Sequence, residues 1–292
     1  MKPAPFKYYA PRSVPEVLAL LDEHGYDAKI LAGGQSLVPM MNFRLVQPAV
    51  IVDINNIPEL ATIESDQKGV QLGAMVRHSQ AEKDPLIKKF APLIHECMPQ
   101  IATTQIRNRG TVGGSLAHAD PSAELVVVTS ALDARFKIQN QKGKRIVPAK
   151  DFFVGLLMTV MEPEDLLVEI EIPNLPPRSG WSLKEIARRP HDFALLGVAA
   201  VLTLDKKDRC QQARLVYLSA GDGPISAPEA AGMLVGEEIT PELITAAADK
   251  AAVDEIDPGG DIHASSDFRR HLANVLTRRA LEEAYQRALG RN

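Results

Sequence analysis

Apolar residues near the start of the chain recur every three or four positions, which is typical of a helix with one buried face. The stripe consists of Val14, Val17, Leu18 and Leu21. Ser13 and Glu16 form a candidate capping box before it, and Gly25 follows it. Because such residues favour helix ends, we predict a helix between Ser13 and Gly25.

Two short apolar runs follow, at 29–32 and 50–54, and both are rich in the aliphatic residues that favour strands. A short helical pattern at 37–43 separates them. A strand, a crossover and a second strand indicate a small βαβ unit in which the two strands lie parallel.

The middle of the chain alternates strand patterns with turns. Strands are predicted at 70–73 and 166–172, and the segment Asn140-Gln141-Lys142-Gly143 is typical of a hairpin turn. That turn joins strand-like runs at 134–139 and 144–147.

Helices are predicted between these strands. Apolar residues with helical spacing run from 86 to 97, with Ser79 and Glu82 as a second candidate capping box. Farther along, Asp120 precedes Pro121, a pair that is typical of a helix N-cap followed by proline in the first turn.

A proline-rich segment at 173–180 marks a change of organisation. Three strand-like runs follow it, at 181–187, 194–204 and 213–219. Helices are then predicted from residue 227, from residue 241 with Thr240 as its cap, and from residue 266. The C-terminal third is therefore expected to form a sheet covered by helices.

The composition excludes several classes of function. The chain has 292 residues, of which 45% are hydrophobic and 24% charged, and its formal net charge is −4. This balance provides neither a basic surface for nucleic acid nor a polybasic patch for anionic lipid. No apolar run is long enough to form a transmembrane segment. Because the first residues lack the apolar core of a signal peptide, we expect a cytoplasmic protein.

The two cysteines, Cys97 and Cys210, lie far apart and form no CxxC pair. A zinc or iron–sulfur site built from this chain alone is therefore not expected, and each thiol is interpreted as a small buried hydrophobic group. Redox chemistry on this chain would need an organic cofactor.

Two glycine pairs carry the most specific signal. The first glycine loop is Ala32-Gly33-Gly34-Gln35-Ser36, and the second is Thr111-Val112-Gly113-Gly114-Ser115. Glycine lets a backbone approach a ligand closely, and backbone N–H groups with nearby hydroxyls suit an anion such as a pyrophosphate. Taken alone, each pair is better explained as a tight turn, and no Rossmann GxGxxG or Walker motif accompanies them.

The two loops, taken together, resemble the paired flavin-binding motifs in the medium subunits of the xanthine dehydrogenase and carbon monoxide dehydrogenase family, the molybdenum hydroxylases. Three further segments are similar to that family. They are the stretch that leads into the second loop (105–110), the stretch Ala119-Asp120-Pro121-Ser122-Ala123-Glu124-Leu125 and the stretch Lys184-Glu185-Ile186-Ala187-Arg188-Arg189. The resemblance extends over nearly the whole chain.

The resemblance implies an α+β fold. Residues 1–56 and 57–176 would be the two parts of an FAD-binding domain of the vanillyl-alcohol-oxidase (PCMH) type, with FAD extended between them. Residues 177–292 would form a C-terminal α+β domain, a three-stranded antiparallel sheet plus helices, that covers the flavin.

The resemblance also implies residue roles. The pyrophosphate would be held by backbone donors of the two loops, at Ala32, Gly33, Gly34, Gln35 and Ser36 and at Thr111, Gly113, Gly114 and Ser115. The adjoining Leu37 would also contact the cofactor. Glu124 would accept hydrogen bonds from cofactor hydroxyls, which suits an ionised carboxylate. Lys184 would lie near the flavin ring and Phe193 over one of its faces. The positions that would contact the cofactor elsewhere are Ile101, Ala102, His118 and Leu167.

Some of these positions have other interpretations. Ile101, Ala102 and Leu167 suit a core, Phe193 suits core packing equally well, and Glu124 alone suits an exposed helix position. His118 and Asp120 could suggest a metal, but no third ligand lies nearby, so no metal site is predicted. No catalytic residue is assigned to this chain.

Three positions depart from the carbon monoxide dehydrogenase pattern. Gln35 replaces a usual histidine, Ser115 a common asparagine and Val126 a common proline. None of these changes removes a required donor, so FAD binding is still expected, although oxidation of carbon monoxide itself is not implied.

By resemblance, the chain is an electron-transfer flavoprotein subunit. The molybdenum cofactor would lie on a large partner subunit and iron–sulfur clusters on a small one, in a dimer of heterotrimers, and the isolated chain should expose an apolar docking patch. Neither the substrate nor the electron acceptor (NAD, a quinone, a cytochrome or oxygen) is determined. The alternatives are a free-standing flavin oxidoreductase, a non-flavin assembly subunit and a phosphoryl transferase, the last disfavoured by the missing Walker lysine pattern.

Overall fold

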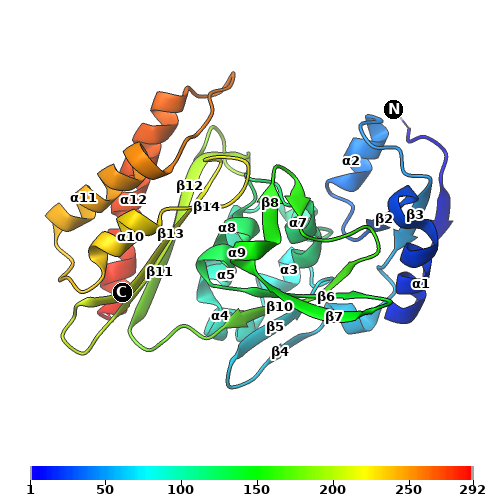
Figure 1. Ribbon diagram of the computed structural model, residues 1–292, viewed down its shortest axis with the longest axis horizontal. Helices are drawn as coiled ribbons and strands as arrows, with labels where there is room; N and C mark the ends of the chain where they lie inside the picture. The colour runs from blue at the N-terminus through cyan, green and yellow to red at the C-terminus, as the bar shows by residue number, and fades with distance from the viewer. Residues whose placement is uncertain (1, 291–292) are drawn as a thin grey trace.

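The computed structural model describes residues 2–290, which are arranged along one long axis (Figure 1). A small parallel sheet lies at the N-terminal end, a mixed layer of helices and an antiparallel sheet lies in the centre, and a second antiparallel sheet with helices lies at the C-terminal end.

The N-terminal part is a three-stranded parallel sheet with a helix packed against it. Its elements are β1 (Lys7–Tyr9), α1 (Val14–His24), a 3₁₀ turn (Gly25–Asp27), β2 (Ala28–Leu31), α2 (Leu37–Asn42) and β3 (Val50–Asp53). The strand order is β1-β3-β2. The predicted parallel pairing of β2 with β3 is confirmed, and β1, which the pattern did not indicate, adds a third strand. The apolar stripe of α1 is buried against this sheet.

The central part is built on a five-stranded antiparallel sheet of order β4-β5-β10-β6-β7. Its strands are β4 (Ile63–Ser65), β5 (Gly69–Gly73), β6 (Arg135–Asn140), β7 (Gly143–Pro148) and β10 (Leu166–Pro173). The helices are α3 (His78–Ala81), α4 (Pro85–Phe90), α5 (Pro92–Cys97), α6 (Thr104–Arg107), α7 (Val112–His118), α8 (Glu124–Ala131) and α9 (Ala149–Phe152). Two 3₁₀ turns (Pro58–Ala61 and Met98–Gln100) and a ribbon of β8 (Phe153–Gly155) and β9 (Met158–Thr159) complete it.

Two predicted helix starts in this part are wrong. Asp120 does not cap a helix, because its carboxylate accepts from the Ser122 N–H at 2.8 Å within a turn, and α8 begins at Glu124. Ser79 lies inside α3, and the N-terminus of α4 is capped by Asp84. A turn thus uses the Asp120 carboxylate, whereas the Asp84 carboxylate accepts from the N–H groups of Leu86 and Ile87 at the start of α4.

The C-terminal part is an antiparallel sheet of order β11-β12-β13-β14, with helices packed on one face. Its elements are β11 (Ser179–Ala187), β12 (Ala194–Leu204), β13 (Cys210–Leu218), β14 (Ile225–Ser226), α10 (Pro228–Leu234), α11 (Pro241–Lys250), a π turn (Ala251–Glu255) and α12 (Ser266–Ala288). The three predicted strands are present, and the two-residue β14 adds a fourth. Thr240 caps α11 as predicted, with its hydroxyl accepting from the Leu243 N–H at 3.2 Å.

The C-terminal sheet contributes to two cores. Every residue of β12 is buried, and side chains alternate between the two faces of a strand. Leu196 and Val198 pack with the helices of the C-terminal part. Ala199 and Val201 belong to the core of the central part. The face of the sheet that is not covered by its own helices is therefore covered by α5 and α8.

Candidate cofactor-binding site

The two glycine loops, about eighty residues apart in sequence, lie against each other. A Cβ added to Gly33 would come within 2.4 Å of the Arg109 carbonyl oxygen and 2.8 Å of the Gly110 Cα. A Cβ added to Gly114 would lie 3.6 Å from the Ala32 Cβ. The Gly33 distances leave no space for a side chain, so glycine at this position lets the two backbones approach so closely, whereas the Gly114 distance is an ordinary contact.

The first glycine loop has free backbone donors. It connects β2 to α2, and Gly34 adopts a positive φ of 73° that suits glycine. Among residues 2–290, no acceptor receives the N–H groups of Gly34, Gln35 or Ser36. The Gln35 side chain instead donates from Nε2 to the Gly33 carbonyl at 3.1 Å. Three neighbouring unpaired N–H groups at the start of a helix are suited to an anion.

The second glycine loop differs from the expectation, because its backbone donors are already used. The N–H groups of Val112 and Gly113 donate to the Val76 and Ala74 carbonyls, each at 2.9 Å. Those of Gly114 and Ser115 donate to the side chain and the carbonyl of Thr111. This loop therefore contributes a close-packed wall, with the Thr111 and Ser115 hydroxyls as its remaining donors.

A brace that the sequence did not indicate holds the loops together. Asn55, just beyond β3, donates from Nδ2 to the Ala32 carbonyl at 2.9 Å. The Arg77 guanidinium donates to both the Asn55 Oδ1 and the Arg109 carbonyl. Arg77 thus connects the N-terminal part to the segment before the second glycine loop. Its only signal in the sequence is a position shortly after the 70–73 strand.

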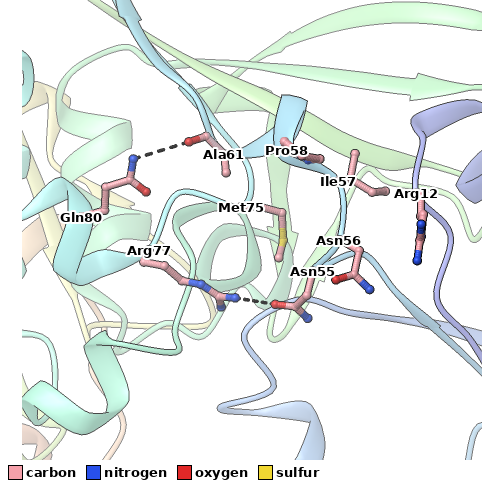
Figure 2. A pocket seen from close by; sticks show the side chains of 9 residues that line it. All are labelled: Arg12, Asn55, Asn56, Ile57, Pro58, Ala61, Met75, Arg77 and Gln80. Atoms are coloured by element: carbon pink, nitrogen blue, oxygen red, sulfur yellow. Dashed lines mark hydrogen bonds between the residues drawn. The ribbon is translucent and has the colours of Figure 1, made fainter.

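A pocket of about 590 Å³ opens beside this brace, between the N-terminal and central parts (Figure 2). Figure 2 shows the Arg77 and Asn55 side chains joined at one side of it. The lining residues are Arg12, Asn55, Asn56, Ile57, Pro58, Ala61, Met75, Arg77 and Gln80. None of the predicted cofactor residues lines this pocket.

Arg107 fixes the loop that carries Ile101 and Ala102. It is a buried arginine on α6 that pairs with Glu82 at 2.9 Å. The same guanidinium donates to the Ile101 and Ala102 carbonyls at 3.1 and 2.9 Å. Ala102 has a positive φ of 42°, an uncommon conformation for a residue with a Cβ. The buried Arg107 guanidinium therefore fixes the conformation of the loop that carries Ile101 and Ala102.

Glu124 begins α8 and is largely enclosed. Burial, together with the nearby Asp120 carboxylate, raises the pKa of Glu124 to about 7. A carboxyl group without a compensating cation suits a neutral ligand that carries hydroxyl groups. Leu167 is buried in the central core, next to an irregularity in β10. His118 is the last residue of α7.

Lys184 and Phe193 lie in less expected surroundings. The Lys184 ammonium forms an ion pair with Glu283 of α12, on the helix-covered face of the C-terminal sheet. Phe193, just before β12, is 76% exposed, which contradicts the core-packing interpretation. An exposed aromatic ring is available to cover a ligand, so its place over the flavin stays a prediction, as does that of Lys184.

Both cysteines are free and buried, which confirms their interpretation as small hydrophobic groups. Between residues 2 and 290, no group of three or more His, Cys, Asp and Glu side chains could hold a metal ion. None of the helices in that range is long and apolar enough to cross a membrane.

Comparison with known proteins places this geometry in a family. Residues 4–175 match the family model for the FAD binding domain in molybdopterin dehydrogenase, and residues 181–284 match the CO dehydrogenase flavoprotein C-terminal domain. The chain belongs to the FAD subunits of the molybdenum hydroxylases. The predicted family and the mixed α+β fold are thereby confirmed.

Two relatives show how far the similarity extends. The chain is 41% identical to the 6-hydroxypseudooxynicotine dehydrogenase complex subunit alpha of Paenarthrobacter nicotinovorans, over 99% of this chain and 97% of the relative. It is 36% identical to the carbon monoxide dehydrogenase medium chain of Hydrogenophaga pseudoflava, over 98% and 99% of the two chains. Both relatives are components of dehydrogenases, so this chain is an oxidoreductase subunit.

Solved structures support the same family assignment. A chain of carbon monoxide dehydrogenase from Hydrogenophaga pseudoflava superposes with a TM-score of 0.95 at 36% identity, covering 98% of this chain and 99% of that one. A chain of quinoline 2-oxidoreductase from Pseudomonas putida 86 superposes with a TM-score of 0.94 at 39% identity, covering 99% and 100%.

The residues present fit FAD. Free N–H groups on the first glycine loop suit its pyrophosphate, Gly33 lets that loop lie directly against the backbone of residues 109–110, and Glu124 is an acceptor for its hydroxyls. FAD is the cofactor of this subunit family, and the individual contacts stay predictions.

Proposed function

We propose that this chain takes electrons from iron–sulfur clusters on a small partner subunit and passes them through FAD to an external acceptor. Bound FAD would supply the exchange between single electrons and electron pairs. The molybdenum cofactor, where the substrate is oxidised, would lie on a large partner subunit. The observation that carries the proposal is the full-length match to carbon monoxide dehydrogenase, together with the junction of the two glycine loops.

The chain's own residues would bind and orient the cofactor. The N–H groups of Gly34, Gln35 and Ser36 would hold the pyrophosphate. The side-chain hydroxyls of Thr111 and Ser115 would donate to it from the second glycine loop. Residues 1–56 and 57–176 would enclose the cofactor, and residues 177–292 would cover its ring. Phe193 would exclude water from one face of the ring.

An exposed apolar turn supports the presence of partner subunits. The turn between β8 and β9 exposes Val154, Leu156, Leu157 and Met158, and β9 packs beside α7, which carries the second glycine loop. Contiguous apolar surface of this kind is typical of an interface. The relatives include chains named as medium subunits, such as that of nicotine 6-hydroxylase of Paenarthrobacter nicotinovorans, and we propose a dimer of heterotrimers.

The test is a visible absorption spectrum of the native complex and of this subunit alone, with the cofactor released by denaturation and identified. We expect flavin absorption bands at about 450 nm and about one FAD per chain. Iron–sulfur absorbance should appear in the complex but not in the isolated subunit. A folded, colourless subunit that takes up no added FAD would favour an assembly role. A monomer that oxidises a small substrate by itself would favour a free-standing oxidoreductase.

A further inference from the structure

Glu185 faces the central part of the molecule, whereas its neighbour Lys184 does not. Ser182 and Lys184 both contact Glu283 on α12, so they share the helix-covered face of β11. Leu183 belongs to the core of the central part. Because successive side chains of a strand point to opposite faces, Glu185 lies on the same face as Leu183.

The Glu185 carboxyl group has one buried oxygen, Oε2, that forms no hydrogen bond with any of residues 2–290. The residue opposite it on β12 is Gly197, and a Cβ added there would lie 2.8 Å from the Glu185 Cβ. A glycine thus leaves room for this side chain. Buried polar atoms are almost always hydrogen-bonded in proteins, so an unpaired one indicates a missing partner.

The groups around Glu185 offer it no cation. Glu124 faces it from α8 and acts on it electrostatically. On α5, Cys97 is a buried neutral thiol, and Glu96 is paired with Arg287. Lys184 is paired on the other face of the strand. Beyond the strand end, residues 188–189 are two exposed arginines.

In these surroundings Glu185 keeps its proton at neutral pH. Burial raises its pKa to about 8, and the Glu124 carboxylate acts in the same direction. A protonated carboxyl group has an O–H donor, which an ionised one lacks. At pH 7 this donor points into the junction between the central part and the C-terminal sheet, beside the residue that is expected to bind cofactor hydroxyls.

We propose that Glu185 belongs to the cofactor site and donates a hydrogen bond to an oxygen atom of bound FAD. This inference rests on the proposed function, because FAD is the ligand that the two glycine loops and Glu124 are expected to hold. This donor role is separate from the place near the flavin ring that the resemblance gives to Lys184. Glu124 and Glu185, from two parts of the chain, would then act as an acceptor and a donor toward one ligand.

The experiment is a titration of FAD into the full chain stripped of its cofactor, at pH 7 and pH 9, for wild type, Glu185→Gln and Glu185→Leu. The amide of glutamine keeps a donor at both pH values. At pH 9 about one tenth of the Glu185 side chains would retain the proton. We therefore expect the affinity of wild type, relative to that of Glu185→Gln, to fall about tenfold from pH 7 to pH 9.

The leucine variant tests the donor without a change of pH. We expect Glu185→Leu to bind FAD about tenfold more weakly than wild type at pH 7, and Glu185→Gln to stay within about threefold. Glu169→Gln, the same substitution in a surface ion pair with Lys137, is the matched control and should follow wild type at both pH values. Circular dichroism of each stripped variant checks the fold.

The outcomes separate the two proposals. If wild type binds no FAD at either pH, the proposed function fails, and the inference fails with it. If wild type binds FAD but Glu185→Gln has the same pH dependence, or Glu185→Leu keeps full affinity, the inference alone is overturned.

Discussion

Arg107 is a charged side chain that lies almost entirely inside the protein. Its guanidinium donates hydrogen bonds to the Glu82 carboxylate and to the carbonyls of Ile101 and Ala102. Removing one partner of a buried pair leaves the other charge without compensation, which costs more than the pair itself contributes. Arg107 should therefore be a much stronger determinant of stability than the exposed arginines.

We expect Arg107→Met to lower the free energy of unfolding by about 3–5 kcal/mol. Arg135→Met is the control, because Arg135 pairs with Glu171 at 3.8 Å near the surface and its loss should cost about 1 kcal/mol or less. Urea unfolding followed by circular dichroism measures both. Equal losses for the two variants would show that Arg107 does not hold the loop.

His78 is a second buried polar residue, located under the segment before the second glycine loop. A Cβ added to Gly110 would lie 2.9 Å from its Nδ1, and neither ring nitrogen has a hydrogen-bond partner in the part of the chain that the structure describes. Burial lowers the pKa of His78 to about 4, against the opposing effect of the Thr111 backbone, and the charges of Arg107 and Arg77 add to the lowering.

This pKa has a defined effect on stability. Because the pKa in the folded state lies below that in the unfolded state, about 6.5, the unfolded chain binds more protons between the two values. The stability contribution of neutral His78 is complete above about pH 6.5 and is lost as the pH falls toward 4. By pH 4.5 we expect wild type to lose about 2–3 kcal/mol relative to His78→Leu.

Urea unfolding of both proteins at pH 7, 5.5 and 4.5 measures this difference. His263→Leu, at an exposed position, serves as the control. If the difference between wild type and His78→Leu does not change with pH, His78 is not held neutral by the fold.

At the scale of elements, the contact between the two glycine loops determines the shape of the site. Gly33 abuts the backbone of residues 109–110, and a backbone gives way less readily than the end of a side chain. Even one added methyl group should push the loops apart and misplace the free N–H groups of the first glycine loop.

We expect Gly33→Ala to weaken FAD binding at least about tenfold, or about 1.4 kcal/mol. Gly223→Ala is the control, because a Cβ there meets nothing within 4 Å. FAD content after purification and affinity by titration are the measurements, with melting temperature as the check on folding. Full FAD content in a folded Gly33→Ala protein would refute the two-loop site.

At the scale of the whole molecule, a latch of three residues joins the C-terminal part to the central part. The Glu96 carboxylate, on α5, accepts from the Trp181 indole N–H at 3.3 Å and from Arg287 at 2.8 Å. Arg287 also donates to the Trp181 carbonyl at 2.9 Å. These three residues lie beside the core that the C-terminal sheet shares with α5 and α8.

Trp181 is the only tryptophan in the chain, so its fluorescence reports on this junction. We expect Arg287→Met to shift the Trp181 emission to longer wavelength and to destabilise the protein by about 1–3 kcal/mol. Lys250→Met, which removes ion pairs with Glu229 and Asp254 inside the C-terminal part, should leave the emission unchanged. An unchanged spectrum in Arg287→Met would mean that the latch does not hold the junction.

Much of the local structure could be predicted from the sequence. The strand at 194–204, the hairpin turn at 140–143 and the Thr240 cap depend on neighbouring residues, whose periodicity and turn chemistry are visible in the chain. The family motifs, in their order along the chain, indicated the fold and FAD as the cofactor. The cap predicted at Asp120 was wrong because its carboxylate accepts from the Ser122 N–H within a turn, and the cap predicted at Ser79 was wrong because Asp84 caps α4 instead.

The tertiary structure decided what each side chain faces. Periodicity indicates that a residue is buried but does not identify its neighbour, because the neighbour comes from a distant segment. The structure alone shows that the Ala74 and Val76 carbonyls accept from two of the backbone donors of the second glycine loop. It alone shows that Arg77 braces the loops and that Glu185, rather than Lys184, lies on the face toward Glu124. These relations join residues that are from about 20 to 100 positions apart, so no local pattern along the chain could determine them.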